Sequence, residues 1–286
     1  MHVTGTVLTL LAIHLVTSAA FFQGAPSTPV RPPTFLNGRA AAVRAATKGK
    51  TDARKTKIYG QFGKKIIMAV KEGGSASPDA NKALRDVISA AKKNNVPVDN
   101  INRAIKKATE SASGDGFSSS IFEVYASGGA SLIISVLTDN PNRAAAEVKN
   151  AVNKASKNTA KMAESGSVTY LYERKGRLEF EKGLVDEEKV MDVAIESDVD
   201  DFEFVTDTEV NAEGTDVDVV YTSSSDLGSL RDGLVSAGSE CNDASLCYKP
   251  MAPVECEEDD FELNMNIIDA LEELEDVDKV EHNMSN

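Results

Sequence analysis

The sequence predicts an α+β protein, in which an N-terminal helical domain precedes two ferredoxin-like α/β domains, one inserted into the other. Three observations lead to this prediction. Apolar residues recur at helical spacing before residue 110, strands and helices alternate after residue 120, and a complete β-α-β-β-α-β unit lies within that alternation. With 286 residues, 41% of them hydrophobic, the chain is long enough for two or three small cores.

Residues 1–50 are predicted to be a targeting presequence. Thr6 to Ala20 is apolar but too short to span a bilayer, and its small last residues resemble a signal-peptide cleavage site. Phe21 to Lys50 has no acidic residue and the Arg, Ser, Ala, Thr and Pro content of a transit peptide. A signal-like segment before a transit-like segment resembles the bipartite presequence of a plastid protein. A plastid location is therefore favoured, a mitochondrion comes second, and no membrane segment is expected in the mature chain.

A basic helical domain is predicted for residues 51–117. Its first helix, from Thr51 to Lys71, has one apolar stripe and ends at Gly73-Gly74. A second helix follows the capping sequence Ser77-Pro78-Asp79 and ends at Asn94-Asn95, and a third begins near Pro97. A Gly/Ser-rich segment then separates this domain from the rest of the chain.

Charge is distributed unevenly along the chain, whose net charge is −14. Residues 51–119 carry +6, whereas residues 120–286 hold 13 Lys/Arg against 38 Asp/Glu. A basic domain in an otherwise acidic chain indicates a polyanionic partner that is held at one end, because the acidic part repels phosphate. The residues expected to contact nucleic acid are Arg54, Lys55, Lys57, Lys64, Lys92, Lys93, Arg103, Lys106 and Lys107.

Residues 118–174 and 249–286 are predicted to form the first α/β domain. Its chain order is interrupted, because a β-β-α-β run lacks the helix and strand that only the end of the sequence supplies. The predicted strands are 121–126, 131–137, 167–173 and 277–282, and the predicted helices are 142–156 and 261–274.

Residues 175–248 are predicted to form the inserted ferredoxin-like domain. Between Lys175 and Asp243 there are 20 Asp/Glu and 5 Lys/Arg, so this domain is a poor candidate for touching nucleic acid. The predicted strands are 177–181, 202–206, 217–222 and 245–248, and the predicted helices are 186–196 and 226–237.

A polar turn and a polar loop in the first α/β domain form a candidate functional site. The turn, at Asn140-Pro141, joins an apolar strand to a helix, and the loop runs from Lys157 to Gly166. Neither carries a residue set that could run a reaction alone, which indicates a binding element. The candidate residues are Asp139, Asn140, Asn142, Arg143, Glu164, Ser165 and Gly166.

The sequence argues against an enzyme and against a bound metal or cofactor. His2 and His14 lie in the presequence, so His282 alone cannot supply a two-histidine metal site and is a poor basis for a catalytic triad. The three cysteines are spaced C-x5-C-x8-C, which fits neither zinc ligands nor a disulfide framework. The phosphate-binding motifs G-x-x-x-x-G-K-[ST] and G-x-G-x-x-G and the hydrolase motif G-x-S-x-G are not found. No catalytic residue, metal or cofactor is expected.

Five motifs in order along the chain resemble the YebC/PmpR family. They are D-A-R-K-T-K-I-Y from Asp52, E-G-G-S-A-S-P-D-A-N from Glu72, N-N-V-P-V-D-N-I-N-R-A-I-K-K from Asn94, L-T-D-N-P-N-R from Leu137 and E-S-G-S-V from Glu164. The resemblance implies a helical domain before two α/β domains, nucleic-acid binding and no catalysis. Bacterial members of this family are described as DNA-binding transcriptional regulators. Its organellar members, which include a translational activator of cytochrome c oxidase subunit I, and some bacterial members act in translation.

Two family features are altered in this sequence. The usual G-H-S-K-W-x-N segment is missing before Asp52, and the G-Y-G-P-G-G turn is shortened to Tyr125 through Gly129. Contacts made by the missing segment therefore cannot be carried over.

Three functions remain open from the sequence. The first is an organellar, ribosome-associated translation factor that binds rRNA or mRNA as a monomer through phosphate contacts. The second is a DNA-binding transcription regulator that uses the same basic face, although a single arginine on the third helix's basic face favours little base readout. The third is a protein-interaction scaffold based on the acidic domains.

Overall fold

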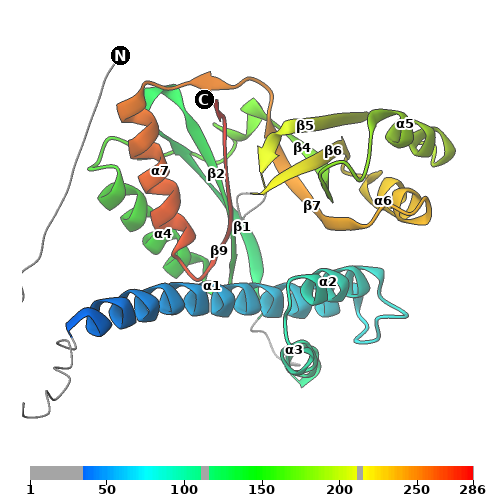
Figure 1. The fold of residues 1–286 in the computed structure, drawn as a ribbon, viewed down its shortest axis with the longest axis horizontal. Helices are drawn as coiled ribbons and strands as arrows, with labels where there is room; N and C mark the ends of the chain where they lie inside the picture. The colour runs from blue at the N-terminus through cyan, green and yellow to red at the C-terminus, as the bar shows by residue number, and fades with distance from the viewer. Residues whose placement is uncertain (1–34, 111–115, 211–214, 286) are drawn as a thin grey trace, which may run out of the picture. The chain divides into compact units, whose positions relative to one another are not determined.

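Residues 35–110, 116–210 and 215–285 are described by the computed structural model, with side chains for 54–110, 116–206 and 215–285. The fold is α+β, as predicted: helices come first, and two antiparallel four-stranded sheets follow (Figure 1). The predicted presequence lies mostly outside the described residues. Residues 49–286 form one compact unit, and the sheets and sites below belong to it.

Three helices form the N-terminal part: α1 (Phe35–Gly73), α2 (Lys82–Lys93) and α3 (Val98–Glu110). Their apolar stripes meet in one core, in which Ile66 and Leu84 are fully buried. Burial of aliphatic side chains, at about 25 cal/mol per Å² of apolar surface, stabilises the short helices α2 and α3 against α1.

The start of α2 differs from the prediction. The sequence Ser77-Pro78-Asp79 was expected to cap this helix, but the cap is Asn81, whose side chain accepts the backbone N–H of Leu84 at 3.0 Å. The same amide donates to the carbonyl of Ala69 in α1 at 2.7 Å, so it ties two helices together. The predicted end is confirmed, because α2 stops at Asn94-Asn95 with Asn95 in the left-handed region.

The first sheet has the strand order β3-β1-β2-β9, and two helices pack on one of its faces. The end of the sequence supplies β9 at one edge, as predicted, next to the apolar β2 in the middle (Figure 1). The elements are β1 (Ser118–Tyr125), β2 (Ser131–Thr138), α4 (Pro141–Ala155), β3 (Lys161–Met162), α7 (Glu258–Glu272) and β9 (Val277–His282). A small parallel pair, β8 (Val254–Glu255) with β10 (Met284–Ser285), adjoins the ends of these elements.

The second sheet has the strand order β5-β6-β4-β7 and contains the predicted β-α-β-β-α-β unit. Its helices cover one face, where Leu178, Phe180 and Leu234 are fully buried. The elements are β4 (Tyr172–Glu181), α5 (Glu187–Glu196), β5 (Phe202–Val210), β6 (Asp216–Ser223), α6 (Leu227–Ser236) and β7 (Cys241–Pro250).

The strand predicted at 167–173 is wrong. Residues Thr169–Leu171 form a short 3-10 helix, and the fourth strand of the first sheet is Lys161–Met162, inside the segment expected to be a loop. Alternation at Val168, Tyr170 and Tyr172 suggested a strand. Instead, Val168 and Tyr172 pack around Ile133 on the sheet face opposite α4 and α7.

Candidate nucleic-acid interface

Seven of the nine basic residues predicted to contact nucleic acid are exposed: Arg54, Lys55, Lys92, Lys93, Arg103, Lys106 and Lys107. Helix α3 carries three of them on its outer face, because Ile101, Ala104 and Ala108 turn the opposite face into the core. The other four lie in two other helices: Arg54 and Lys55 in α1, and Lys92 and Lys93 at the end of α2.

The lysines of α3 have weak partners within the protein. Lys106 lies 3.6 Å from Glu110, but both side chains are more than 60% exposed, and such surface pairs contribute about 0 to 1 kcal/mol. The Lys107 ammonium lies 5.8 Å from the centroid of the Phe117 ring. Both lysines can exchange these contacts for a phosphate.

Two of the nine predicted contacts need correction, because Lys57 and Lys64 are turned toward the first sheet. Lys57 donates to the carbonyl of Glu272 at the end of α7. Burial lowers the pKa of Lys57, and the nearby carboxylates of Glu272 and Asp278 only partly oppose this effect. The helix face that was expected to meet solvent packs on the α/β part, so Lys57 is not a free phosphate ligand.

Lys64 is buried, with 8% of its surface exposed. Its ammonium lies 2.5 Å from Asp276 and donates to the carbonyls of Leu137 and Glu275 at 3.1 and 3.2 Å. Three acceptors saturate an ammonium group. Lys64 therefore joins α1 to the end of β2 and to the segment after α7, and its ammonium group is fully used within the protein.

Lys93 is exposed but also engaged, since it donates to the carbonyl of Cys241 at the start of β7. Helix α2 meets the inserted unit at two further points: Arg231 of α6 lies 3.3 Å from Asp86, and Lys82 lies 3.8 Å from Asp232. Helix α2 thus contacts the inserted acidic unit. Helix α3 is therefore the basic helix with the weakest contacts within the protein.

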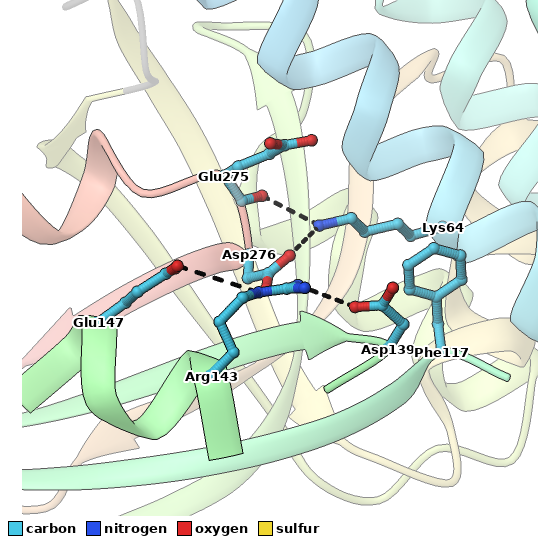
Figure 2. Close-up of a pocket in the computed structure, with 7 residues that line it drawn as sticks. All are labelled: Lys64, Phe117, Asp139, Arg143, Glu147, Glu275 and Asp276. Atoms are coloured by element: carbon cyan, nitrogen blue, oxygen red, sulfur yellow. Dashed lines mark hydrogen bonds and ion pairs between the residues drawn. The ribbon is translucent and has the colours of Figure 1, made fainter. Parts of the chain in front are cut away.

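The predicted functional turn is organised by Arg143 (Figure 2). Asn140 caps α4 by accepting the backbone N–H of Arg143 at 3.1 Å, and Pro141 occupies the first helical turn. The Arg143 guanidinium donates to Asp139 at 2.8 Å and to Asp276 at 2.7 Å. These two hydrogen bonds, the one to Asp276 first, raise the pKa of Arg143.

Asp276 is the common partner of this cluster. One carboxylate oxygen contacts Lys64, and the other accepts from Arg143 and from the Thr138 hydroxyl at 2.8 Å. Burial alone would raise the pKa of Asp276, but these hydrogen bonds outweigh it and hold the pKa below its ordinary value. This carboxylate was not among the predicted residues, and no sequence pattern marks it.

A pocket of about 310 Å³ opens beside this cluster, as Figure 2 shows. Four carboxylates and two cationic side chains line it together with one aromatic ring, so its net charge disfavours phosphate. The lining residues are Lys64, Phe117, Asp139, Arg143, Glu147, Glu275 and Asp276.

The predicted loop is held by a second buried carboxylate. Glu123 in β1, 4% exposed, accepts the backbone N–H groups of Gly166, Val168 and Thr169 at 2.5 to 2.9 Å. Burial tends to raise the pKa of Glu123, but these three donors outweigh it and lower the pKa. Glu123 was not predicted, although an acid within the apolar run I-F-E-V is a signal that could have indicated it.

The loop residues themselves stand out into solvent. Glu164, Ser165 and Gly166 are exposed, and Gly166 adopts a φ of 85° that favours glycine. The loop and the Arg143 cluster are held by two different buried carboxylates. Asn142 is exposed in the first turn of α4.

The described residues offer little for catalysis. His282 is part-buried, burial lowers its pKa, and its Nδ1 accepts the backbone N–H of Met284 at 3.3 Å. Burial raises the pKa of Cys241 to about 11, so this thiol is a poor nucleophile. In the part of the chain that the structure describes, no cluster of three potential metal ligands occurs. The described helices also include none with the length and apolarity that a bilayer span requires.

Two family models match the chain. The model of the TACO1/YebC protein N-terminal domain matches residues 39–111, and the model of the TACO1/YebC second and third domain matches residues 117–284. The first match begins before residue 51, where the helical domain was predicted to start, and the predicted domain boundaries remain predictions.

Similar proteins are found in bacteria. A "probable transcriptional regulatory protein" of Chlamydia pneumoniae is 41% identical over 238 residues, which covers 83% of this chain and 94% of the relative. A protein with the same description from Clostridium beijerinckii is 37% identical over 238 residues and covers 83% of this chain and 92% of the relative. The crystal structure of a conserved hypothetical protein from Aquifex aeolicus aligns with a TM-score of 0.70 at 33% identity, covering 82% of this chain and 91% of that one.

Proposed function

The chain belongs to the TACO1/YebC family, and from this premise we propose that it is a nucleic-acid-binding regulator, without catalysis of its own, that acts in translation by docking on ribosomal RNA. One observation carries the proposal. The outer face of α3 presents Arg103, Lys106 and Lys107 to solvent, in a chain whose residues from 120 onward hold three times as many acids as bases. Such a face attracts phosphate, and the acidic inserted unit repels it.

The character of the exposed side chains favours backbone contacts over base readout. Lysine ammonium groups act as point charges on phosphates, whereas base edges are read by bidentate arginine, asparagine or glutamine. The outer face of α3 also exposes Asn102 beside Arg103, but two of its three cations are the lysines Lys106 and Lys107. Contact with folded RNA through its phosphates is therefore the better match.

An organelle is the proposed site of action. The presequence composition of residues 1–50 supports this part of the proposal, with a plastid favoured and a mitochondrion second. The exposed residues Glu164, Ser165 and Gly166 would then reach toward a functional centre of the ribosome while α3 holds the RNA.

A DNA-binding regulator is the second candidate, and two observations favour it. The bacterial relatives are named as probable transcriptional regulatory proteins. In addition, α2 and α3 are joined by the four-residue turn 94–97, a length typical of helix-turn-helix units. This candidate requires sequence preference at moderate salt, which the first candidate does not.

Ribosome co-sedimentation of the full chain, in plastid and in mitochondrial extracts, tests the proposal. The variant with Arg103, Lys106 and Lys107 all replaced by glutamine should leave the ribosomal fraction at lower salt than the unmodified chain. Three lost phosphate contacts should reduce the slope of log affinity against log salt by about 2 to 3 for RNA. A control with the same charge change, Arg174, Lys182 and Lys189 to glutamine, lies in the acidic unit and should behave like the unmodified chain.

The opposing outcomes are equally clear. Absence of the unmodified chain from the ribosomal fraction in both extracts would refute the translational role. A gel shift on a DNA library that shows sequence preference would instead support the second candidate.

A further inference from the structure

The acidic α/β part contains one basic island. Residues 120–286 hold 13 Lys/Arg and 38 Asp/Glu in total, whereas residues 140–163 alone hold five of those Lys/Arg and one of those acids. This segment comprises α4 and the turn that leads into β3. A solvated face in an acidic domain would be expected to share the acidity of its surroundings, so the island calls for an explanation of its own.

Helix α4 separates its residues cleanly into two faces. Ala144, Val148 and Val152 are buried against the first sheet. At 100° per residue, Lys149 and Lys154 flank the opposite arc, and both are exposed. The polar Asn150 and Asn153 lie between them on that arc, so the outer face of α4 combines two cations with two amides.

The turn after α4 adds a further exposed lysine, Lys157. Two backbone N–H groups of this turn close the end of the helix: Ser156 donates to the carbonyl of Val152, and Asn158 donates to the carbonyl of Asn153. Lys157 and Asn158 both adopt left-handed conformations, with φ of 51° and 67°, at a helix end where glycine is the usual residue. A lysine thus occupies a position where its backbone is strained, and its side chain is exposed.

The lysines of this surface are not neutralised within the protein. Lys149, Lys154, Lys157 and Lys161 are all exposed, and none has an ion-pair partner among the residues that the structure describes. The one acid of the segment, Glu147, lies 3.9 Å from Arg143. Helix α7 lies beside α4 (Figure 1), and it exposes acids such as Glu262 and Asp269.

We infer that this surface, defined as Lys149, Lys154, Lys157 and Lys161 and called the α4 basic surface, is a second site for the phosphate backbone of RNA. The inference rests on the proposed RNA binding and extends it from the helical part to the first α/β unit. Four unneutralised ammonium groups with two neighbouring amides suit phosphate and sugar oxygens, and such contacts fix the register of a protein on RNA. Two separate phosphate-binding surfaces, on α3 and on α4, fix the orientation of the protein on a folded RNA, whereas a single surface would allow it to rotate.

Salt-dependent binding of the full chain tests the inference. The probe is a fluorescein-labelled RNA stem-loop with single-stranded flanks, measured by fluorescence anisotropy over a series of KCl concentrations. Replacing all four lysines with glutamine should reduce the slope of log affinity against log salt by about 3, and the lysine-to-arginine variant should keep the slope. The Arg174, Lys182 and Lys189 to glutamine control changes the charge elsewhere and should leave the slope within about one contact of the unmodified value.

Lys157→Gly separates binding from stability. Glycine relieves the left-handed strain, so the variant should melt at the same temperature as the unmodified chain or higher. Its RNA slope should nevertheless fall by about 0.7, the contribution of one contact to single-stranded RNA.

The failure of this inference can be told apart from the failure of the proposed function. If the triple α3 variant loses salt dependence while the quadruple α4 variant matches the unmodified chain, the α4 basic surface is refuted and RNA binding stands. If the unmodified chain binds neither the stem-loop nor ribosomes, both are overturned. A drop in both variants supports two phosphate-binding surfaces.

Discussion

At the scale of single residues, Asp276 determines how several side chains are used. Its carboxylate holds Lys64 of α1 and Arg143 of α4 at the same time. Because charge-assisted hydrogen bonds to a carboxylate that is only 9% exposed are strong, both cations are held on Asp276, although the Arg143 side chain is itself 46% exposed. The turn at Asp139 and the long helix α1 are therefore connected through the same carboxylate.

Substituting neighbouring lysines of α1 should expose this difference in role. Lys64→Met leaves Asp276 short of one cation and two carbonyls without their donor, and it should lower the free energy of unfolding by about 3 kcal/mol. Lys65→Met is the matched control: its partner is Asp278, its side chain is 39% exposed, and its loss should cost no more than about 1 kcal/mol. Urea unfolding followed by circular dichroism measures both.

Acid unfolding provides a second test of the Lys64–Asp276 contact. The pKa of Asp276 is depressed in the folded state, so its contribution is present above the unfolded value of about 3.9 and is lost as pH falls through the folded value. Lys64→Met should lose less stability over that range than the unmodified chain. Equal losses, or equal urea stabilities for the two lysine variants, would contradict the assignment.

The sequence could identify Arg103 and Lys106 as exposed cations, because the 3.6-residue period of α3 is a local property. It could not do so for Lys64, whose acceptors come from residues more than seventy positions away. A lysine opposite an apolar stripe has the same local pattern whether it meets water or a carboxylate. The same limit explains why Asp276 and Glu123 were missed.

At the scale of elements, two adjacent segments were misassigned: the predicted loop 157–166 contains β3, and the predicted strand 167–173 contains a 3-10 helix. The apolar alternation of 167–173 was interpreted as a strand, but Glu123 accepts N–H groups of this region that a strand would have used in a ladder. Here the tertiary hydrogen bonds to Glu123 determine the backbone conformation, and the local apolar alternation does not. Most of the other strands and helices matched in position because their hydrophobic periods agreed with their final packing, although α1 begins at Phe35 and not at the predicted Thr51.

Glycines inside helices provide the element-scale prediction. A Cβ added at Gly60 of α1 meets no atom within 4 Å, whereas one at Gly233 of α6 would lie 2.7 Å from Cγ1 of Val193 and 2.6 Å from Oγ of Ser197 in the neighbouring α5 segment. Gly60→Ala should therefore raise the free energy of unfolding by about 1 kcal/mol. Gly233→Ala should lower it by about 2 kcal/mol, since α5 and α6 must move apart.

Thermal and urea unfolding of the two alanine variants decide the matter. A stabilising Gly233→Ala would mean that α5 and α6 do not pack through this glycine. A destabilising Gly60→Ala would mean that this part of α1 needs its backbone uncovered.

At the scale of the whole molecule, charge is distributed unevenly among the units. The inserted unit holds 20 of the chain's 45 Asp/Glu, and α5 alone exposes Glu188, Asp192 and Glu196 on one face. Over distances beyond a Debye length these charges act only at low salt. They should therefore limit how the protein approaches nucleic acid more than how tightly it holds it.

Neutralising that acidic face tests this view. The variant with Glu188, Asp192 and Glu196 replaced by glutamine should bind the RNA stem-loop faster and more tightly at low salt, by up to about tenfold in association rate. The gain should vanish near 1 M salt, where the Debye length is about 3 Å. Stopped-flow anisotropy measures the rate, and a gain that persists at high salt would instead indicate a direct contact.

The interrupted first sheet has a consequence for the order of synthesis. The second sheet is encoded in one continuous stretch, so it can be completed soon after residue 250 leaves the ribosome. The first sheet must wait, because β2 pairs with β9, which is translated last of its strands. Until then the edge of an almost fully buried strand is open, as are the carbonyls that Lys64 will bind. A chaperone that recognises apolar strand edges would find its target in this interval, and a premature stop codon before residue 277 would make the interval permanent.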